Sequence, residues 1–241
     1  MTSFAPSASS ALKSTLSFPI PVKAVMVDLD GTMLDTADDL AAAANAMLRE
    51  LGIPERTPER IKSFIGKGLV KLVKRCLTDD PEGEPDPALL ARAMPVYERN
   101  YAAVLQHQTR PYPGVSEGLE ALHRGGYRLA CITNKGEKFT LPLLEATGLR
   151  HYFELVLCGD TLPRRKPDPL PLTHACERFG IEPREMVLIG DSLNDVQAAR
   201  GAGCPVFCVP YGYNEGGDVR DLDCDAIVET ILEAVSLIRK A

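Results

Sequence analysis

The sequence predicts an α/β fold, a doubly wound, mainly parallel and Rossmann-like sheet with an inserted helical cap domain. Short apolar segments of β type alternate with helical patterns along most of the chain. These segments are apolar at successive positions, as in strands that helices cover on both faces. One connection is much longer than a parallel crossover requires. A length of 241 residues with 45% hydrophobic residues suits a sizeable core with a smaller companion.

The first twenty residues differ in composition from the rest of the chain. They are rich in serine and alanine, lack acidic residues and carry one positive charge, Lys13. They also lack a continuous apolar segment of signal-peptide length. We therefore predict a flexible N-terminal tail over residues 1–20.

The α/β core is expected to comprise residues 21–36 and 108–241. The expected strands are residues 24–29, 127–133, 153–159, 186–191, 205–209 and 225–228. Helical patterns fill the intervals between them, at residues 115–124, 137–147, 169–179, 194–202 and 230–239. This alternation predicts right-handed crossovers and helices on both faces of the sheet.

Nearly a hundred residues separate the first two expected strands, and this interval shows only helical patterns. Thr36 and Asp39 have capping-box spacing, which predicts the start of a helix. Apolar stripes at helical spacing follow at residues 40–51 and 61–76. A third helical pattern at 89–105 contains Pro95, which should bend or divide it. We therefore predict a helical cap domain over residues 37–107.

Composition excludes several classes of function. A formal net charge of -6 without a basic stripe argues against nucleic-acid binding, and no apolar run is long enough to cross a bilayer. The seven cysteines form no CxxC pair and the four histidines no HxxxH motif, so neither a disulfide framework nor a zinc site is indicated. We expect a cytoplasmic monomer or homodimer.

Polar residues follow the ends of several predicted strands. In chain order they are Asp28 and Asp30, Thr133 and Asn134, Lys166, and Asp191 and Asp195. Taken singly, each could merely cap a turn or a helix. The carboxyl ends of parallel strands meet at one edge of a sheet, where ligands bind. Several carboxylates crowded there need a cation and Lys166 among them, so this edge is the predicted active site.

Phosphoryl transfer through an aspartyl phosphate fits this set of residues. Asp28 is the expected nucleophile, and Asp30 would protonate the leaving alkoxide and then deprotonate the attacking water. Thr133 and Lys166 would hold the nonbridging phosphate oxygens.

A carboxylate can attack phosphorus only when both charges are screened, which Mg²⁺ held by oxygen ligands would achieve. We expect Asp191 to complete this Mg²⁺ site. Asp195 is expected to orient the metal's waters or Lys166.

Four ordered motifs, "DLDGTMLDT", "ITN", "RRKPDP" and "GDSLND", resemble those of the haloacid dehalogenase superfamily of phosphatases. The resemblance covers the core and the helical insertion, which corresponds to the superfamily's cap. It implies that the Asp28 carboxylate, the backbone carbonyl of Asp30 and the Asp191 carboxylate bind Mg²⁺. A phosphomutase retains both aspartates of the first motif and remains an alternative, as does a phosphatase for another small metabolite such as a sugar phosphate. A receiver-type phospho-acceptor module has no cap.

The segments "FIGKGLVKLVKRCL", "VLCGDTLPRRKPDPLPL" and "YGYNEGG" are similar to those of the bacterial phosphoglycolate phosphatase family. This resemblance implies a small phosphorylated metabolite, 2-phosphoglycolate, as substrate. Its carboxylate requires a cation, and we expect Lys67 or Arg75 of the cap to bind it. The apolar stripe predicts that Arg75 lies on another face of its helix from the buried residues. Asn134 is a further expected substrate-binding residue.

Overall fold

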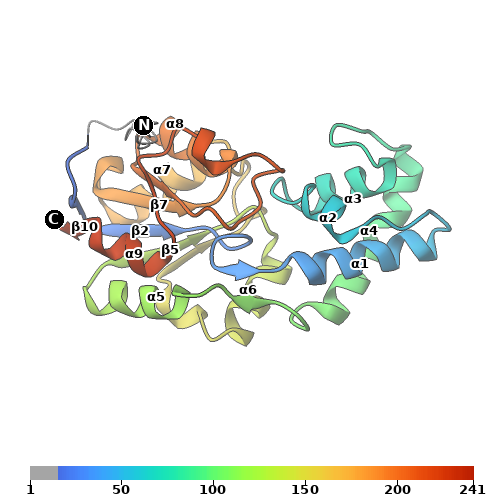
Figure 1. Ribbon diagram of the computed structural model, residues 1–241, viewed down its shortest axis with the longest axis horizontal. Helices are drawn as coiled ribbons and strands as arrows, with labels where there is room; N and C mark the ends of the chain where they lie inside the picture. The colour runs from blue at the N-terminus through green and yellow to red at the C-terminus, as the bar shows by residue number, and fades with distance from the viewer. Residues whose placement is uncertain (1–15) are drawn as a thin grey trace, which may run out of the picture.

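A computed structural model describes residues 16–241, and within them the central sheet has six parallel strands. Their spatial order is β6 (Leu155–Leu157), β5 (Arg128–Ile132), β2 (Ala24–Val27), β7 (Met186–Gly190), β8 (Val206–Cys208) and β9 (Ala226–Ile227) (Figure 1). In register, Ala24 pairs with Arg128 on one side and with Met186 on the other. All six predicted strands are present, and each is shorter than its apolar segment.

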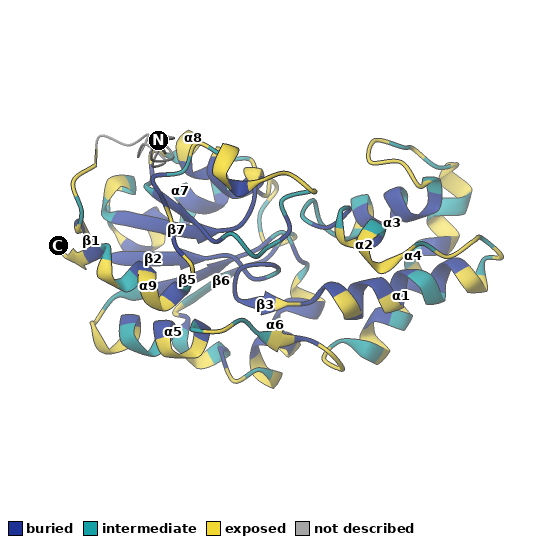
Figure 2. Cartoon of the chain, in the orientation of Figure 1, coloured by how far each residue is buried: buried dark blue, intermediate teal, exposed yellow. Residues whose placement is uncertain are grey.

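Helices cover both faces of this sheet, as the sequence predicts. Val25 and Val27 of β2 face a cluster with α5 (Val115–Arg124), α6 (Glu137–Ala146) and α9 (Ile231–Ser236). Ala24 and Met26 face the other cluster, with α7 (Leu170–Phe179) and α8 (Leu193–Ala202). Short 3₁₀ turns lie at Arg150–Tyr152, Pro183–Glu185 and Val219–Asp221. The inner strands β2, β7 and β8 are buried throughout (Figure 2). A doubly wound core is therefore confirmed.

Four helices between β2 and β5 form the cap: α1 (Ala37–Glu50), α2 (Pro58–Lys62), α3 (Leu69–Thr78) and α4 (Pro87–Val104). They pack around their own apolar cluster, which Phe139 and Tyr213 of the core join. The cap stands beyond one end of the sheet in Figure 1. Its two connections to the core contain β3 (Leu34–Asp35) and β4 (Arg110–Pro111), which pair with each other as a short antiparallel pair. The domain limits of 37 and 107 stay a prediction.

One helical pattern predicted for the cap is corrected. The pattern at 61–76 belongs to two helices, because Gly66 and Gly68 adopt positive φ values of 124° and 78° between α2 and α3. Helix α4 continues through Pro95, so the helix is not divided there, and a bend at Pro95 stays a prediction.

The predicted capping box is absent, because both of its side chains bind elsewhere. Thr36 donates to Asp30 at 2.7 Å. Asp39 is buried and accepts from the backbone N–H of Gln108 and Thr109. Asp39 thus ties the start of the cap to its end.

The two ends of the described chain pair with each other. β1 (Ile20–Val22) runs parallel to β10 (Ile238–Lys240), with Ile20 opposite Ile238. The predicted tail boundary at residue 20 is therefore corrected, since Ile20 is buried in a strand; residues 1–15 of that tail lie outside the described part. The last predicted helix is also corrected, because α9 ends at Ser236 and a strand follows. Within residues 16–241, no helix is long and apolar enough to cross a membrane.

Candidate active site

The polar residues predicted at the strand ends lie together in a cavity between the sheet edge and the cap. Asp28 and Asp30 follow β2, Thr133 and Asn134 follow β5, and Asp191 follows β7. Lys166 reaches the same cavity from the loop after β6. Apolar side chains of the cap, including Leu69 and Leu72, line the opposite wall. Parallel strands thus bring distant sequence segments to one edge.

The loop after β2 is shaped so that the carboxylates of Asp28 and Asp191 can approach each other. The backbone N–H of Asp28 donates to Ile189 O at 3.0 Å, which continues the pairing with β7. The chain then turns at Gly31, whose φ is 86°. A Cβ atom at this position would lie 2.3 Å from Asp191 Oδ2, so only glycine fits. Thr32 donates to Asp191 Oδ1 at 2.8 Å from the same loop.

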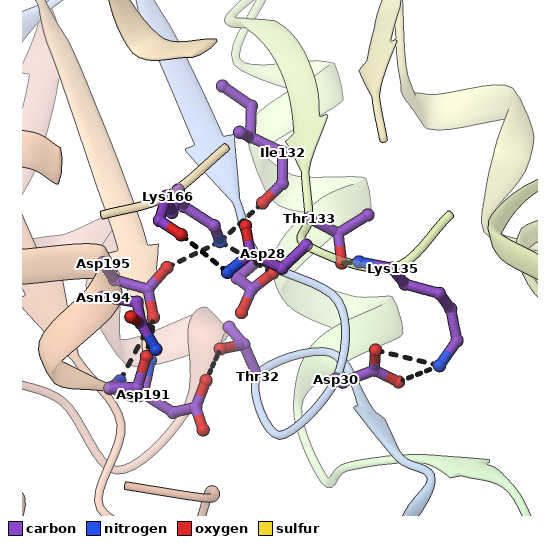
Figure 3. A network of polar contacts seen from close by, with 12 residues as sticks. Asp28, Asp30, Thr32, Ile132, Thr133, Lys135, Lys166, Asp191, Asn194 and Asp195 are labelled. Carbon is purple, nitrogen blue, oxygen red and sulfur yellow. Dashed lines mark hydrogen bonds and ion pairs between the residues drawn. The ribbon is translucent and has the colours of Figure 1, made fainter. Parts of the chain in front are cut away.

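Lys166 is the buried cation between the carboxylates (Figure 3). Its Nζ lies 2.8 Å from Asp28 Oδ1 and 2.7 Å from Asp195 Oδ1, and it donates to Ile132 O at 2.7 Å. Burial alone would lower the pKa of Lys166, but Asp195 and Asp28 raise it overall. Lys166 therefore stays protonated and can attract a phosphate.

Burial also changes the acidity of the carboxylates. It raises the pKa of Asp28 to about 7, although Lys166 opposes the change. Burial, followed by the charges of Asp195 and Asp28, raises the pKa of Asp191 well above its usual range. Holding these carboxylates together in ionised form is therefore unfavourable in free energy, and a bound cation would offset this repulsion.

Asp28, Asp191 and Asp195 could each offer one oxygen to a metal ion, with the three oxygens within 4.8 Å of one another. Asp195 differs from the other two because protein donors occupy its carboxylate. Its Oδ1 accepts from Lys166, and its Oδ2 accepts from the backbone N–H and the hydroxyl of Ser192, at 3.1 and 2.7 Å. Asp195 therefore contacts Lys166, and its predicted role of orienting Lys166 or the metal's waters stays a prediction. The oxygen-only donor set of Asp28 and Asp191 suits a hard divalent cation.

Asp30 turns away from this group and toward Lys135 (Figure 3). Lys135 Nζ lies 2.8 and 2.9 Å from the two oxygens of Asp30, and Thr36 donates to the same carboxylate. Lys135 is a site residue that the sequence analysis missed. Its position directly after Thr133 and Asn134 at the end of β5 was an available signal.

Thr133 is buried in the cavity wall, where its Oγ1 accepts from the backbone N–H of Lys135. The Asn134 amide donates to Lys166 O at 2.9 Å and to Gly66 O, in the cap, at 3.2 Å. Its buried Oδ1 has no hydrogen-bond partner among residues 16–241. Asn134 thus lies in the cavity and also bridges the core to the cap.

The structure does not bring Lys67 and Arg75 to the cavity wall. Arg75 is 2% exposed, which corrects its predicted place apart from the buried face of its helix. Its guanidinium binds Glu215 at 2.6 Å and the backbone oxygens of Phe64 and Pro81. Lys67 also binds Glu215, at 3.1 Å. Glu215 lies in the "YGYNEGG" segment, and the sequence analysis gave it no role.

This fold and this site together indicate one particular family of hydrolases. The sequence pattern of the haloacid dehalogenase-like hydrolases matches residues 25–209, and the chain belongs to that family.

Within this family, the chain is similar to individual proteins that share one name. The chain is 66% identical over 224 residues to a phosphoglycolate phosphatase of Nitrosospira multiformis, covering 93% of this chain and 99% of the relative. It is 59% identical over 225 residues to a phosphoglycolate phosphatase of Thiobacillus denitrificans, with the same two coverages. A crystal structure of a predicted phosphoglycolate phosphatase from Haemophilus somnus superposes with a TM-score of 0.84 at 34% identity, covering 89% of this chain and 96% of that one.

Proposed function

We propose that this hydrolase is a Mg²⁺-dependent phosphatase that converts 2-phosphoglycolate to glycolate and phosphate through an aspartyl phosphate. The observation that carries the proposal is the buried Asp28 carboxylate, which lies 2.8 Å from the Lys166 ammonium and in one cluster with Asp191. The names of the relatives that are 66% and 59% identical support the substrate.

The residues present fit a magnesium ion. Asp28 and Asp191 together with the backbone carbonyl of Asp30 would hold it, and all of these donors are oxygen atoms. The raised pKa values of Asp28 and Asp191 reflect buried carboxylates in each other's field, which favours a cation there. When bound, Mg²⁺ supplies the positive charge that lets a carboxylate approach a phosphate.

In the first half-reaction, one oxygen of Asp28 forms a bond to phosphorus while the bond from phosphorus to the glycolate oxygen breaks. Asp30 donates its proton to the departing alkoxide, so glycolate leaves with a neutral hydroxyl group. Thr133 and Lys166 hold the nonbridging oxygens of the phosphoryl group during the transfer.

In the second half-reaction, Asp30 accepts a proton from water as the water oxygen bonds to phosphorus. The bond between phosphorus and the Asp28 oxygen breaks, which releases phosphate and restores the carboxylate. Lys166 remains a cation throughout, because Asp195 and Asp28 raise its pKa against the effect of burial.

A panel of phosphorylated metabolites tests the proposal, with released phosphate as the readout. We expect 2-phosphoglycolate to give the highest kcat/KM among glycolate, hexose and nucleotide phosphates. Asp28→Asn should be inactive on all of them. Asp223→Asn, which changes an exposed carboxylate that pairs with Arg200, is the matched control. A higher kcat/KM on hexose phosphates or nucleotides would overturn the substrate, and an active Asp28→Asn would overturn the mechanism.

A further inference from the structure

The reacting groups of this site lie on the floor of the cavity between the sheet edge and the cap. Asp28 is 8% exposed, Asp191 2% and Lys166 3%. A phosphorylated substrate enters such a cavity more readily when the wall above these groups moves away, and closure of that wall excludes water. That wall is the cap, which has its own apolar cluster and joins the core through two connections. The contacts that hold the cap against the core therefore govern access to the site.

Glu215 comes from the core and makes two of these contacts. One carboxylate oxygen lies 2.6 Å from Arg75 Nη1 and the other lies 3.1 Å from Lys67 Nζ. Both cations belong to the cap. Glu215 has a φ of 49°, in the left-handed region that glutamate rarely adopts. The glutamate is thus held in an unfavourable backbone conformation by its partners.

Arg75 is fixed inside the cap before it meets Glu215. Its Nε donates to Pro81 O at 2.7 Å, and its Nη1 donates to Phe64 O at 2.9 Å. These two bonds fix the orientation of the planar guanidinium. The Arg75 side chain is 2% exposed and that of Glu215 29%, so their ion pair is partly shielded from solvent and less weakened by it than a fully exposed pair.

The segment that carries Glu215 also contacts the site and the cap's first connection. The backbone N–H of Tyr213 donates to Asp191 Oδ2, and the Tyr213 hydroxyl accepts from the backbone N–H of Thr36 and Ala37, where α1 begins. Asn214 accepts from the backbone N–H of Leu193 at the start of α8. We call residues 213–215 the latch segment. Its three consecutive residues contact the cluster of carboxylates, the cap connection and the cap itself.

We propose that Glu215 is a positioning residue that latches the cap closed over the substrate through Arg75 and Lys67, and that the latch segment couples this closure to Asp191. The proposal rests on the phosphatase function only for its kinetic readout. It also gives Lys67 and Arg75 a different role from the one expected, because the Glu215 carboxylate already pairs with both cations.

Glu215→Gln is the test, with Glu82→Gln as the matched control. Glu82 also pairs with Arg75, at 3.6 Å, but it lies in the cap and is exposed. Both variants remove one negative charge from Arg75, and only Glu215→Gln removes it across the gap between cap and core. For Glu215→Gln we expect KM to rise about tenfold on both 2-phosphoglycolate and p-nitrophenyl phosphate, because the cap closes less tightly over bound substrate. We expect kcat to change less than about twofold, since saturating substrate restores closure.

Hydrogen exchange provides a readout that does not depend on activity. In Glu215→Gln, amides of residues 64–70 and of the latch segment should exchange faster, while those of β2 and β5 should be unchanged. Glu82→Gln should match the unmodified protein in exchange and kinetics. Adding Lys67→Met to Glu215→Gln should change KM by less than about twofold, because the two residues act together.

Other outcomes overturn the proposal. A loss confined to 2-phosphoglycolate would mean that these residues act on the substrate carboxylate. Unchanged exchange with unchanged KM would mean that the contacts do not control closure. If 2-phosphoglycolate proves a poor substrate, the aryl phosphate and the exchange data still decide on the latch, so the two proposals fail separately.

Discussion

Lys135 Nζ lies 2.8 Å from Oδ1 and 2.9 Å from Oδ2 of Asp30, although the two residues are 105 positions apart in the sequence. The lysine is buried, and its Nζ lies 5.0 Å from the centre of the Tyr101 ring. Together with Thr36, it supplies all the side-chain donors to the Asp30 carboxylate among residues 16–241. The proposed acid and base is thus held by the end of the neighbouring strand.

This contact predicts that Lys135→Met lowers activity. Without the ammonium, the Asp30 carboxylate loses its charged donor and is no longer held for proton transfer. We expect kcat/KM to fall about tenfold to a hundredfold, as for the loss of a charge-assisted hydrogen bond worth roughly 1.5–3 kcal/mol. Lys23→Met, which breaks a partly exposed pair with Glu185, is the control in the same steady-state assay. Normal turnover in Lys135→Met would show that Asp30 needs no such support.

Asp28→Asn should stop hydrolysis completely, because an amide cannot form the covalent bond to phosphorus. Intact-protein mass spectrometry after a brief incubation with substrate should detect a phosphate adduct on the unmodified protein and none on this variant. A phosphate adduct on a histidine or serine would contradict the assignment.

The same substitution should raise stability in the absence of metal. Burial raises the pKa of Asp28 from 3.8 to about 7 in the folded protein. The folded state therefore binds this proton more tightly, so the group's stabilisation is full below pH 3.8 and is lost as pH rises through about 7. At about pH 8, metal-free Asp28→Asn should melt above the unmodified protein, by about 2–4 °C for each kcal/mol gained. Thermal melts at about pH 5, where the difference should shrink, complete the test.

Magnesium binding should strengthen as pH rises, whereas the contribution of Asp28 to stability is lost as pH rises. The metal needs ionised carboxylates, and protons compete for Asp28 and Asp191, whose pKa values burial raises. Calorimetry should show the affinity for Mg²⁺ weakening as pH falls through about 7, by up to about tenfold per pH unit for each proton displaced. Asp191→Asn should bind weakly at every pH. An affinity that is flat between about pH 6 and 8 would argue against these ligands.

Asp195→Asn should destabilise the protein and disorganise the site. The Asp195 carboxylate is fully buried and accepts from Lys166 and from two donors of Ser192. An amide nitrogen would face one of these donors, at a cost of roughly 2–4 kcal/mol in unfolding free energy. Urea unfolding measures this cost. Asp223→Asn should leave it unchanged, and an equally stable Asp195→Asn would mean that the network is dispensable.

Much of the fold could be predicted because its determinants are local. Strands covered on both faces are apolar at successive positions, so all six strands of the main sheet were found. The strands β1 and β10 were missed because they pair only with each other, outside the main sheet, and neither lies in an apolar segment covered on both faces. The capping box was wrong for a related reason, since Thr36 and Asp39 bind partners that the spacing alone does not reveal.

The core side of the site could be predicted, whereas the cap side could not. Parallel strands must bring Asp28, Lys166 and Asp191 to one edge, so topology alone brings them together. The environment of Arg75 depends instead on a loop 140 positions later in the sequence, and no periodic pattern in α3 distinguishes a buried arginine from an exposed one. Glu215 was overlooked because its role comes entirely from its partners.

The pairing of β1 with β10 bears on how the chain completes its fold during synthesis. Ile20 is among the first described residues to emerge from the ribosome, and its partner Ile238 is among the last. The backbone N–H of Ala241 donates to Val22 O. β1 therefore cannot find its partner until residues 238–240 have been synthesised, whereas the cap and most of the main sheet can form earlier. More than two hundred residues are made while β1 waits for the strand that pairs with it.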